Sequence, residues 1–354
     1  MAPCSILIVP DSFKGSLTAH EASEAIALGV RRAWPEAELR LLPLSDGGEG
    51  FLDCVRSCLE TEERASWVSG ADGGARHARW LFEPAQRRAW LETAEVVPLE
   101  DVGPQRVGSG TSRGVGELLR IAAAQGAARI SLGVGGTGTV DGGAGCLIGL
   151  GAQIFDDQGH VLEPGAARLA DVARIDWPGT ALPEIELLCD VRSPLVGPRG
   201  AARLYGPQKG LGPDQVRRVE RAMSAWAHLL DEHLGCDPSA LPFSGAGGGI
   251  AGALMAADGA VPRSGVERLA ESVELDVAIA DATIIVTGEG RVDAQSEEGK
   301  VLDHVLRRAQ HIGRPVQVIA GRIAPDAYPW LASHGARARA CAPDTIQEPV
   351  SSDL

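Results

Sequence analysis

Residues 5–42, SILIVPDSFKGSLTAHEASEAIALGVRRAWPEAELRLL, decide the fold class of this chain. The segment opens with a short aliphatic run that ends at Pro10, a pattern typical of a buried strand. Thr18 and Glu21 then have the spacing of a helix capping box, and apolar residues follow at helical intervals. A second aliphatic run at 39–42 completes a strand–helix–strand unit, which predicts a parallel sheet.

The same order of elements recurs near the other end of the chain. We predict a strand at 283–287, a helix at about 301–310 and a strand at 316–320. Between the two units, residues 66–92 alternate in polarity and are rich in Trp and Arg, which predicts short antiparallel strands. The tail after Ala336 has no regular pattern and is expected to be irregular and loosely packed.

The middle of the chain also has its own helices and strands. We predict a helix at 111–125, strands at 129–134 and 184–189, and a long helix after Pro213. The fold class is therefore α/β with two α/β domains: a Rossmann-like parallel-sheet domain built from both chain ends, and a second, mixed α/β domain from the middle. The expected limits are residues 1–64 plus 283–354 for the first domain and 65–282 for the second.

Composition excludes several classes of protein. A length of 354 residues suits two domains, and a formal charge of −14 argues against nucleic acid as a partner. No apolar run approaches the roughly 20 residues that cross a bilayer, so no membrane partner is expected. The seven cysteines are scattered without metal-ligand spacing, and we expect a cytoplasmic protein. The oligomeric state is left open.

The lysines are few and all three lie beside glycine. Of 33 basic residues only Lys14, Lys209 and Lys300 are lysines, and their neighbours are Gly15, Gly210 and Gly299. A compact positive charge beside flexible backbone is a common way to bind phosphate. The pattern therefore predicts anion-binding sites at these three positions.

Glycine-rich turns follow the ends of the predicted strands, and each pairs glycine with a carboxylate, a lysine or both. In parallel α/β sheets ligands bind at the carboxyl ends of strands. Glycine exposes backbone N–H groups to anionic oxygens, and carboxylates hold Mg²⁺ or orient a hydroxyl group. Phosphoryl transfer needs this set of groups. The turns are residues 10–16, 45–50, 135–143, 190–195 with 206–210, and 288–296.

One alternative is a dinucleotide-binding site. Gly133, Gly135 and Gly138 match the G-x-G-x-x-G spacing after a strand, and Asp156 and Asp157 lie at a suitable distance to bind a ribose. This is the basis of a dehydrogenase hypothesis, which is the weaker interpretation because glycines are abundant throughout the chain.

Six segments resemble the signature segments of the bacterial glycerate kinases that phosphorylate D-glycerate with ATP. In order they are PDSFKGS (10–16), DGGEG (46–50), TSRGVGELL (111–119), DGGAG (141–145), GPQKG (206–210) and GEGRVDAQS (288–296). The resemblance runs to about residue 322. It implies a Mg²⁺-dependent kinase of glyoxylate and glycerate metabolism that uses ATP and makes 2-phosphoglycerate, with an active site between its two domains.

The kinase hypothesis assigns roles to the charged residues of these segments. Lys14, Lys209 and Lys300 would bind anionic oxygens, with Lys14 nearest the transferred phosphoryl group. Asp46 and Asp190 are the candidates for binding Mg²⁺ and for orienting the attacking hydroxyl group.

Further residues would bind the two substrates. Asp11, Ser12 and Ser16 are candidates for the phosphate or the acid, and Arg291 could hold the carboxylate of glycerate. The candidates for the nucleotide are Gly135, Gly136, Thr137, Asp141, Gly288, Glu289, Gly290 and Asp293.

The chain departs from the family pattern at several positions. Val140 stands where a polar residue is usual, Ser193 replaces a usual asparagine, and Leu302 and His304 are unusual for the family. These departures leave open a second hypothesis, an inactive protein on the kinase scaffold that binds a nucleotide or an organic acid.

Overall fold

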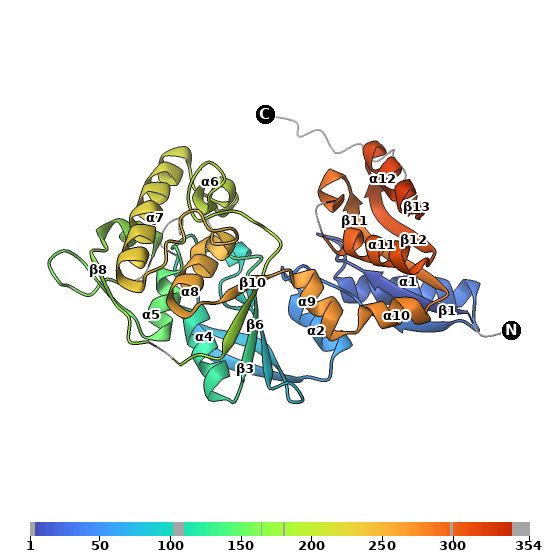
Figure 1. Ribbon diagram of the computed structural model, residues 1–354, viewed down its shortest axis with the longest axis horizontal. Helices are drawn as coiled ribbons and strands as arrows, with labels where there is room; N and C mark the ends of the chain where they lie inside the picture. The colour runs from blue at the N-terminus through green and yellow to red at the C-terminus, as the bar shows by residue number, and fades with distance from the viewer. Residues whose placement is uncertain (1–3, 102–109, 164, 180, 298–299, 342–354) are drawn as a thin grey trace. The chain divides into compact units, whose positions relative to one another are not determined.

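The computed structural model describes residues 4–101, 110–163, 165–179, 181–297 and 300–341. The chain forms two compact units, and Figure 1 shows their ribbons. Unit 1 contains residues 1–46, 53–59 and 266–354, and unit 2 contains residues 47–52 and 60–265. The chain re-enters unit 1 at Val266, so α10 (Leu275–Asp281) and nearly all of α9 (Gly265–Ser272) lie there. The sequence-based limits place both helices in the middle domain.

Unit 1 is built on a five-stranded parallel sheet with the order β13-β12-β11-β1-β2. Figure 1 shows the blue amino-terminal and red carboxy-terminal segments side by side in this sheet, where Pro10 pairs with Gly288. Helix α1 packs on β1 and β2, and α11 packs on β11. The bounds are β1 Ser5–Pro10, α1 Ala19–Ala33, β2 Glu38–Leu41, α2 Phe51–Cys58 (shared with unit 2), β11 Ile284–Val292, α11 Val301–Ile312, β12 Val316–Ile323, α12 Tyr328–Ser333 and β13 Arg337–Ala340.

The local signals read from the first segment form as predicted. Thr18 accepts the backbone N–H of Glu21 at 3.2 Å, and the Glu21 carboxylate accepts the backbone N–H of Thr18 at 2.8 Å. The apolar face of α1 buries Ile26 against Ile8 of β1. Capping thus fixes where the helix begins, and burial fixes which face meets the sheet.

The expectation for the tail is wrong in part. Residues 337–340 form β13, which pairs in parallel with β12 through Gln317↔Arg337 and the three following positions. An edge strand needs a partner on one side only, so a short segment of alternating Arg and Ala can fill it without an apolar run. Residues 342–354 lie outside the described part of the chain.

Unit 2 is built on a six-stranded mixed sheet with the order β10-β9-β6-β5-β4-β3. The pairs β3–β4 and β4–β5 are antiparallel, as predicted for residues 66–92, and the remaining pairs are parallel. The strand bounds are β3 Glu62–Ser69, β4 Ala75–Glu83, β5 Arg88–Glu92, β6 Arg129–Gly133, β9 Glu184–Leu188 and β10 Val261–Arg263, with a separate hairpin of β7 Gln153–Phe155 and β8 Arg174–Asp176.

Helices pack against this sheet and around one large apolar core. Their bounds are α3 Thr93–Val96, α4 Arg113–Ala124, α5 Ala144–Leu150, α6 Ala201–Tyr205, α7 Pro213–Leu234 and α8 Ile250–Asp258. Short 3₁₀ helices of both units are η1 Leu99–Asp101, η2 Ala166–Asp171, η3 Pro207–Lys209, η4 Ala246–Gly249, η5 Ala294–Glu297 and η6 Pro325–Ala327. Helix α7 buries Met223 and Trp226 and leaves Arg217, Arg218 and Arg221 exposed, as its spacing predicts.

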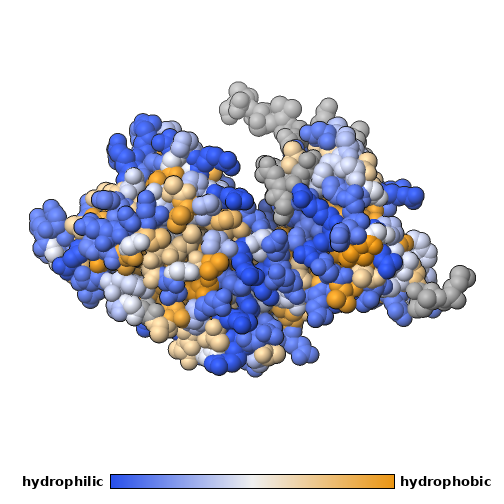
Figure 2. All heavy atoms as spheres, in the orientation of Figure 1, coloured by the Kyte–Doolittle hydropathy of each residue, from blue (hydrophilic) through white to orange (hydrophobic). Residues whose placement is uncertain are grey.

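The two sheets confirm the predicted fold class of two α/β parts, one from both chain ends and one from the middle. On the face drawn in Figure 2, hydrophilic side chains cover most of each unit and apolar side chains form separate patches. Within the described residues, no helix combines the length and the apolar character that a membrane crossing requires.

Candidate active site

In unit 1, the chain turns sharply where β1 ends. The backbone N–H of Asp11 donates to the carbonyl of Gly288 at 2.9 Å, and that of Ser12 donates to Asp11 Oδ1 at 2.6 Å. Phe13 then pairs with Leu17 through two backbone hydrogen bonds, so that the residues between them form a tight loop. Lys14 is exposed on this loop, while Asp11 is half-buried at its base.

The sequence predicts a turn at residues 288–296. In the structure, however, residues 288–292 form the second half of β11. Its glycines are needed because neighbouring backbone approaches closely. A Cβ atom at Gly288 would lie 1.8 Å from the carbonyl oxygen of Ile319, and one at Gly290 would lie 3.1 Å from Phe13 Cα and 3.2 Å from Lys14 N. Gly290 therefore allows the Lys14 loop to rest on β11.

The carboxyl end of this sheet gathers several of the predicted site residues. The pKa of Asp11 is raised to about 7, first by burial of its carboxyl group and then by the charge of Asp46. Glu289 raises that pKa further and Lys14 lowers it. These four residues are thus close enough to act on each other electrostatically. The segment that carries Asp46 runs beside the end of β1, because the backbone N–H of Leu44 donates to the carbonyl of Pro10 at 3.1 Å.

Glu289 is the most buried member of this charged group. Only 7% of it is exposed, and its Oε1 atom is buried without a hydrogen-bond partner among the described residues. Burial raises the pKa of this carboxyl group, while a hydrogen bond from Ser296 and the charges of Lys300 and Lys14 lower it. A buried acceptor without a donor costs free energy, so a ligand that satisfies it gains affinity.

The remaining predicted residues of unit 1 lie around this group. Lys300 is half-buried at the start of α11, and Ser16 is exposed on the Lys14 loop. Arg291 is exposed, and its Nε atom forms an ion pair with Asp293 Oδ2 at 3.1 Å. Arg291 is therefore held by Asp293 in this structure and points its charge to solvent.

A magnesium site in unit 1 would need carboxylates that lie close together. The described residues contain no group of three or more His, Cys, Asp or Glu side chains placed to hold a metal ion. Mg²⁺ is usually held by one or two carboxylates together with substrate phosphates and water. The neighbouring carboxylates of Asp11 and Asp46 match this smaller set.

In unit 2, the glycine loop after Asp46 packs against the carboxyl ends of strands. A Cβ atom at Gly47 would lie 2.9 Å from the carbonyl oxygen of Leu188, and one at Gly135 would lie 2.6 Å from Gly48 Cα. Glu92, at the end of β5, accepts the backbone N–H groups of Gly50 at 3.1 Å and Leu52 at 3.2 Å. Glu92 is absent from the sequence-based candidates because it lies in no glycine-rich turn.

The loop 135–143, which the sequence predicts to bind the nucleotide, forms several hydrogen bonds within unit 2. The Thr137 hydroxyl group bonds to the carbonyl of Val134 at 2.9 Å and to the Thr93 hydroxyl group at 2.8 Å. The carbonyl of Gly136 accepts the backbone N–H of Leu99 at 2.8 Å. These contacts make the loop part of the packing of the unit.

Asp141 is buried completely and is surrounded by donors. Its carboxylate accepts the backbone N–H of Ser112 at 2.7 Å, the Ser112 hydroxyl group at 2.9 Å and the N–H groups of Gly143 and Gly145, both at 3.2 Å. Burial raises the pKa of Asp141, and these donors oppose the shift. Asp141 therefore joins the first turns of α4 and α5.

Lys209 is also buried, with 5% of the residue exposed. Its Nζ atom donates to the carbonyl of Thr139 at 2.7 Å. Burial lowers the pKa of Lys209 to about 7, while the Asp141 charge raises it. Asp190 follows β9 and is half-buried, and the nearby Ser193 hydroxyl group is buried without a partner among the described residues.

The structure weakens one argument for each of the two alternatives. Val140 is 4% exposed and belongs to the apolar core, so an apolar side chain suits this position. Asp156 accepts the backbone N–H groups of Gln158 and His160, and α5 begins only at Ala144, too far from Gly138 for a dinucleotide fingerprint.

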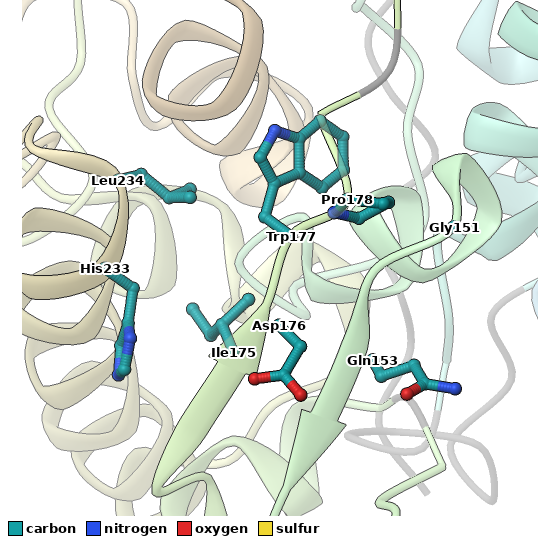
Figure 3. Close-up of a pocket in the computed structure, with 8 residues that line it drawn as sticks. All are labelled: Gly151, Gln153, Ile175, Asp176, Trp177, Pro178, His233 and Leu234. Atoms are coloured by element: carbon teal, nitrogen blue, oxygen red, sulfur yellow. The ribbon is translucent and has the colours of Figure 1, made fainter.

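A separate hollow of about 550 Å³ lies in unit 2, on the side of the β7–β8 hairpin and the end of α7 (Figure 3). It contains none of the residues discussed above. Its lining residues are Gly151, Gln153, Ile175, Asp176, Trp177, Pro178, His233 and Leu234.

Lysines and buried carboxylates at the carboxyl end of a parallel sheet are typical of enzymes that transfer phosphoryl groups. The family model described as "Glycerate kinase family" matches residues 6–349. The chain belongs to the glycerate kinase family.

Individual relatives cover nearly all of the chain. The glycerate 2-kinase of Escherichia coli K12 is 38% identical over 330 residues, which are 91% of this chain and 86% of that protein. The glycerate kinase of Bacillus subtilis 168 is 35% identical, with the same shares of the two chains. A crystal structure of a protein assigned as glycerate kinase 2 from Salmonella typhimurium LT2 matches with a TM-score of 0.83 at 38% identity, over 95% of this chain and 89% of that chain.

Proposed function

We propose that this chain transfers the γ-phosphoryl group of ATP to the 2-hydroxyl group of D-glycerate and releases 2-phosphoglycerate. The family and the name of the Escherichia coli relative, glycerate 2-kinase, support the substrate. The observation that carries the proposal is the group of Asp11, Lys14, Asp46, Glu289 and Lys300 in unit 1, whose charges act on each other.

Lys14 binds the phosphoryl group that is transferred. Its exposed ammonium group lies on a loop that is fixed at both ends, by the Asp11–Gly288 hydrogen bond and by the Phe13–Leu17 pair. A fixed positive charge stabilises the negative charge of the equatorial oxygens in a loose transition state.

Asp46 acts on the nucleotide phosphates and Asp11 acts on the acceptor. Asp46 would hold Mg²⁺ together with the nucleotide phosphates, and the bound ion would neutralise charge on those phosphates. Asp11, with a pKa of about 7, is suited to accept the proton of the attacking hydroxyl group near neutral pH. Asp190 remains the second candidate for either task.

Lys300, Glu289 and Asp293 bind the nucleotide in this proposal. Lys300 supplies positive charge at the start of α11, and Glu289 offers its unpartnered oxygen to a donor such as a ribose hydroxyl group. Arg291, Ser12 and Ser16 remain candidates for binding the anionic groups of the substrates, whereas Lys209 is buried against the Thr139 carbonyl.

ADP release from Mg-ATP with D-glycerate, with L-glycerate and without acceptor tests the reaction, and phosphorus NMR of the product identifies the phosphorylated hydroxyl group. Release that depends on D-glycerate, with a 2-phosphoglycerate resonance, is the expected result. A 3-phosphoglycerate resonance would refute the position. Calorimetric binding of ATP without turnover of any acceptor would favour the inactive scaffold.

A further inference from the structure

Glu92 is a buried carboxylate at the carboxyl end of β5, with 2% of the residue exposed. Its two oxygens accept two backbone N–H groups, Gly50 N at 3.1 Å and Leu52 N at 3.2 Å. Leu52 lies in the first turn of α2, where free N–H groups and the helix dipole favour a negative charge. Glu92 therefore fixes the junction between the glycine loop 47–50 and α2.

The same loop is held on its other side by close packing. Gly47 lies against Leu188 at the end of β9, and Gly48 lies against Gly135 just after β6. Gly47 and Gly50 have φ angles of +88° and +83°, which side chains other than glycine adopt at a cost. Glycine contacts thus hold the start of the loop, and Glu92 holds its end.

We infer that Glu92 is a positioning residue for Asp46, the residue that directly precedes this loop. The inference depends on the proposed role of Asp46 in the reaction. A carboxylate next to a loop that could swing would sample many positions, and a misplacement of about 1 Å can lower a rate by about a hundredfold. Glu92 prevents this because it anchors the loop through both oxygens.

Retaining a carboxylate here has a cost, which argues that it serves more than packing. Burial and the neighbouring Glu95 charge raise the pKa of Glu92 to about 7, while the two N–H groups and Arg79 lower it. Arg79 is itself paired with Glu95 at 2.8 Å, so it compensates Glu92 only in part. An apolar side chain at this position would avoid that cost but leave the buried N–H of Leu52 and the half-buried N–H of Gly50 without this acceptor.

Glu92→Gln in the full chain is the direct test. Glutamine keeps the size and one acceptor but places an NH₂ group against a backbone N–H, so one anchor is lost. We expect kcat to fall about tenfold or more while KM for ATP stays within twofold. Amide hydrogen exchange of a peptide spanning residues 47–52 should become faster.

Glu117→Gln is the matched control. Glu117 also accepts a backbone N–H, that of Ser69 at 2.7 Å, but Ser69 belongs to β3 and not to the loop. It should lower stability without changing kcat. Equal kcat losses in both variants, or an unchanged kcat in Glu92→Gln while Asp46→Asn is inactive, would overturn the inference. An active Asp46→Asn variant would instead refute the proposed role of Asp46.

Discussion

The aspartates of two glycine-rich segments, Asp11 and Asp141, differ in the number of hydrogen-bond donors around them. In unit 1, Asp11 receives one backbone N–H, and its pKa is raised to about 7 by burial and by nearby carboxylates. In unit 2, Asp141 is buried among four donors and joins two helices. The lysines differ in the same way, since Lys14 is exposed and Lys209 is buried against a carbonyl. The same residue types thus lie in the proposed site of unit 1 and in the interior of unit 2, where four donors satisfy Asp141.

The largest expected effect separates the two lysines. Lys14→Met should lower kcat by about a hundredfold or more, because a fixed charge at the transferred group is lost. Its melting temperature should stay nearly unchanged, because the side chain is exposed. Steady-state kinetics and thermal unfolding measure both quantities. Arg221→Met, on the exposed face of α7, is the control, and a loss below about tenfold, roughly 1.4 kcal/mol, would remove Lys14 from the chemistry.

Asp141→Asn tests whether the unit 2 turn is structural. The new NH₂ group would face backbone donors, so we expect the free energy of unfolding to fall by about 1–3 kcal/mol in urea titrations. Asp156→Asn provides the comparison, because Asp156 also accepts two backbone N–H groups but lies on an exposed turn. If both variants unfold at the same urea concentration, the contrast drawn for Asp141 fails.

The pH dependence of stability should identify Asp11. Its pKa is about 7 in the folded protein against 3.8 in the unfolded chain, so ionisation is disfavoured by folding. This group therefore contributes stability that is complete below about pH 4 and is lost as the pH rises to about 7. Asp11→Asn should flatten this decline in chemical unfolding experiments. Glu92 adds a decline in the same range, so the flattening is partial. An unchanged profile would show that Asp11 is not desolvated.

The smallest expected effect concerns the contact between the Lys14 loop and Gly290 of β11. Gly290→Ala places a methyl group 3.1 Å from Phe13 Cα, so the loop must move by a few tenths of an ångström. We expect a several-fold lower kcat with an unchanged fold, measured by kinetics and circular dichroism. Gly29→Ala is the control, because Gly29 lies in α1 with a helical conformation and has open space around it. Gly313 would not serve, because its φ is +76°. Gly29→Ala should leave kcat unchanged, and equal losses in both variants would contradict the role of Gly290.

The sequence predicts candidate residues for the proposed site in unit 1, but it does not predict their surroundings. Lys14, Asp46 and Lys300 are candidates because each lies in or beside a glycine-rich turn after a strand. Glu289 was placed in a turn and lies in β11, because a strand can contain glycines where its neighbour approaches closely. Glu92 is not among the candidates from the sequence, because nothing in the residues around it indicates that another loop donates to it.

The sequence by itself determined the elements and their order: the capping of α1, the strand runs, the amphipathic face of α7 and the division into an outer and a middle part. These depend on local propensity and on periodic burial, which neighbouring residues encode. Only the tertiary structure decided which carboxylates and lysines are satisfied within the fold and which remain available to a substrate. That depends on donors and acceptors far apart in the chain, as with Glu92 and Gly50 or Lys209 and Thr139, and no local pattern records such pairs.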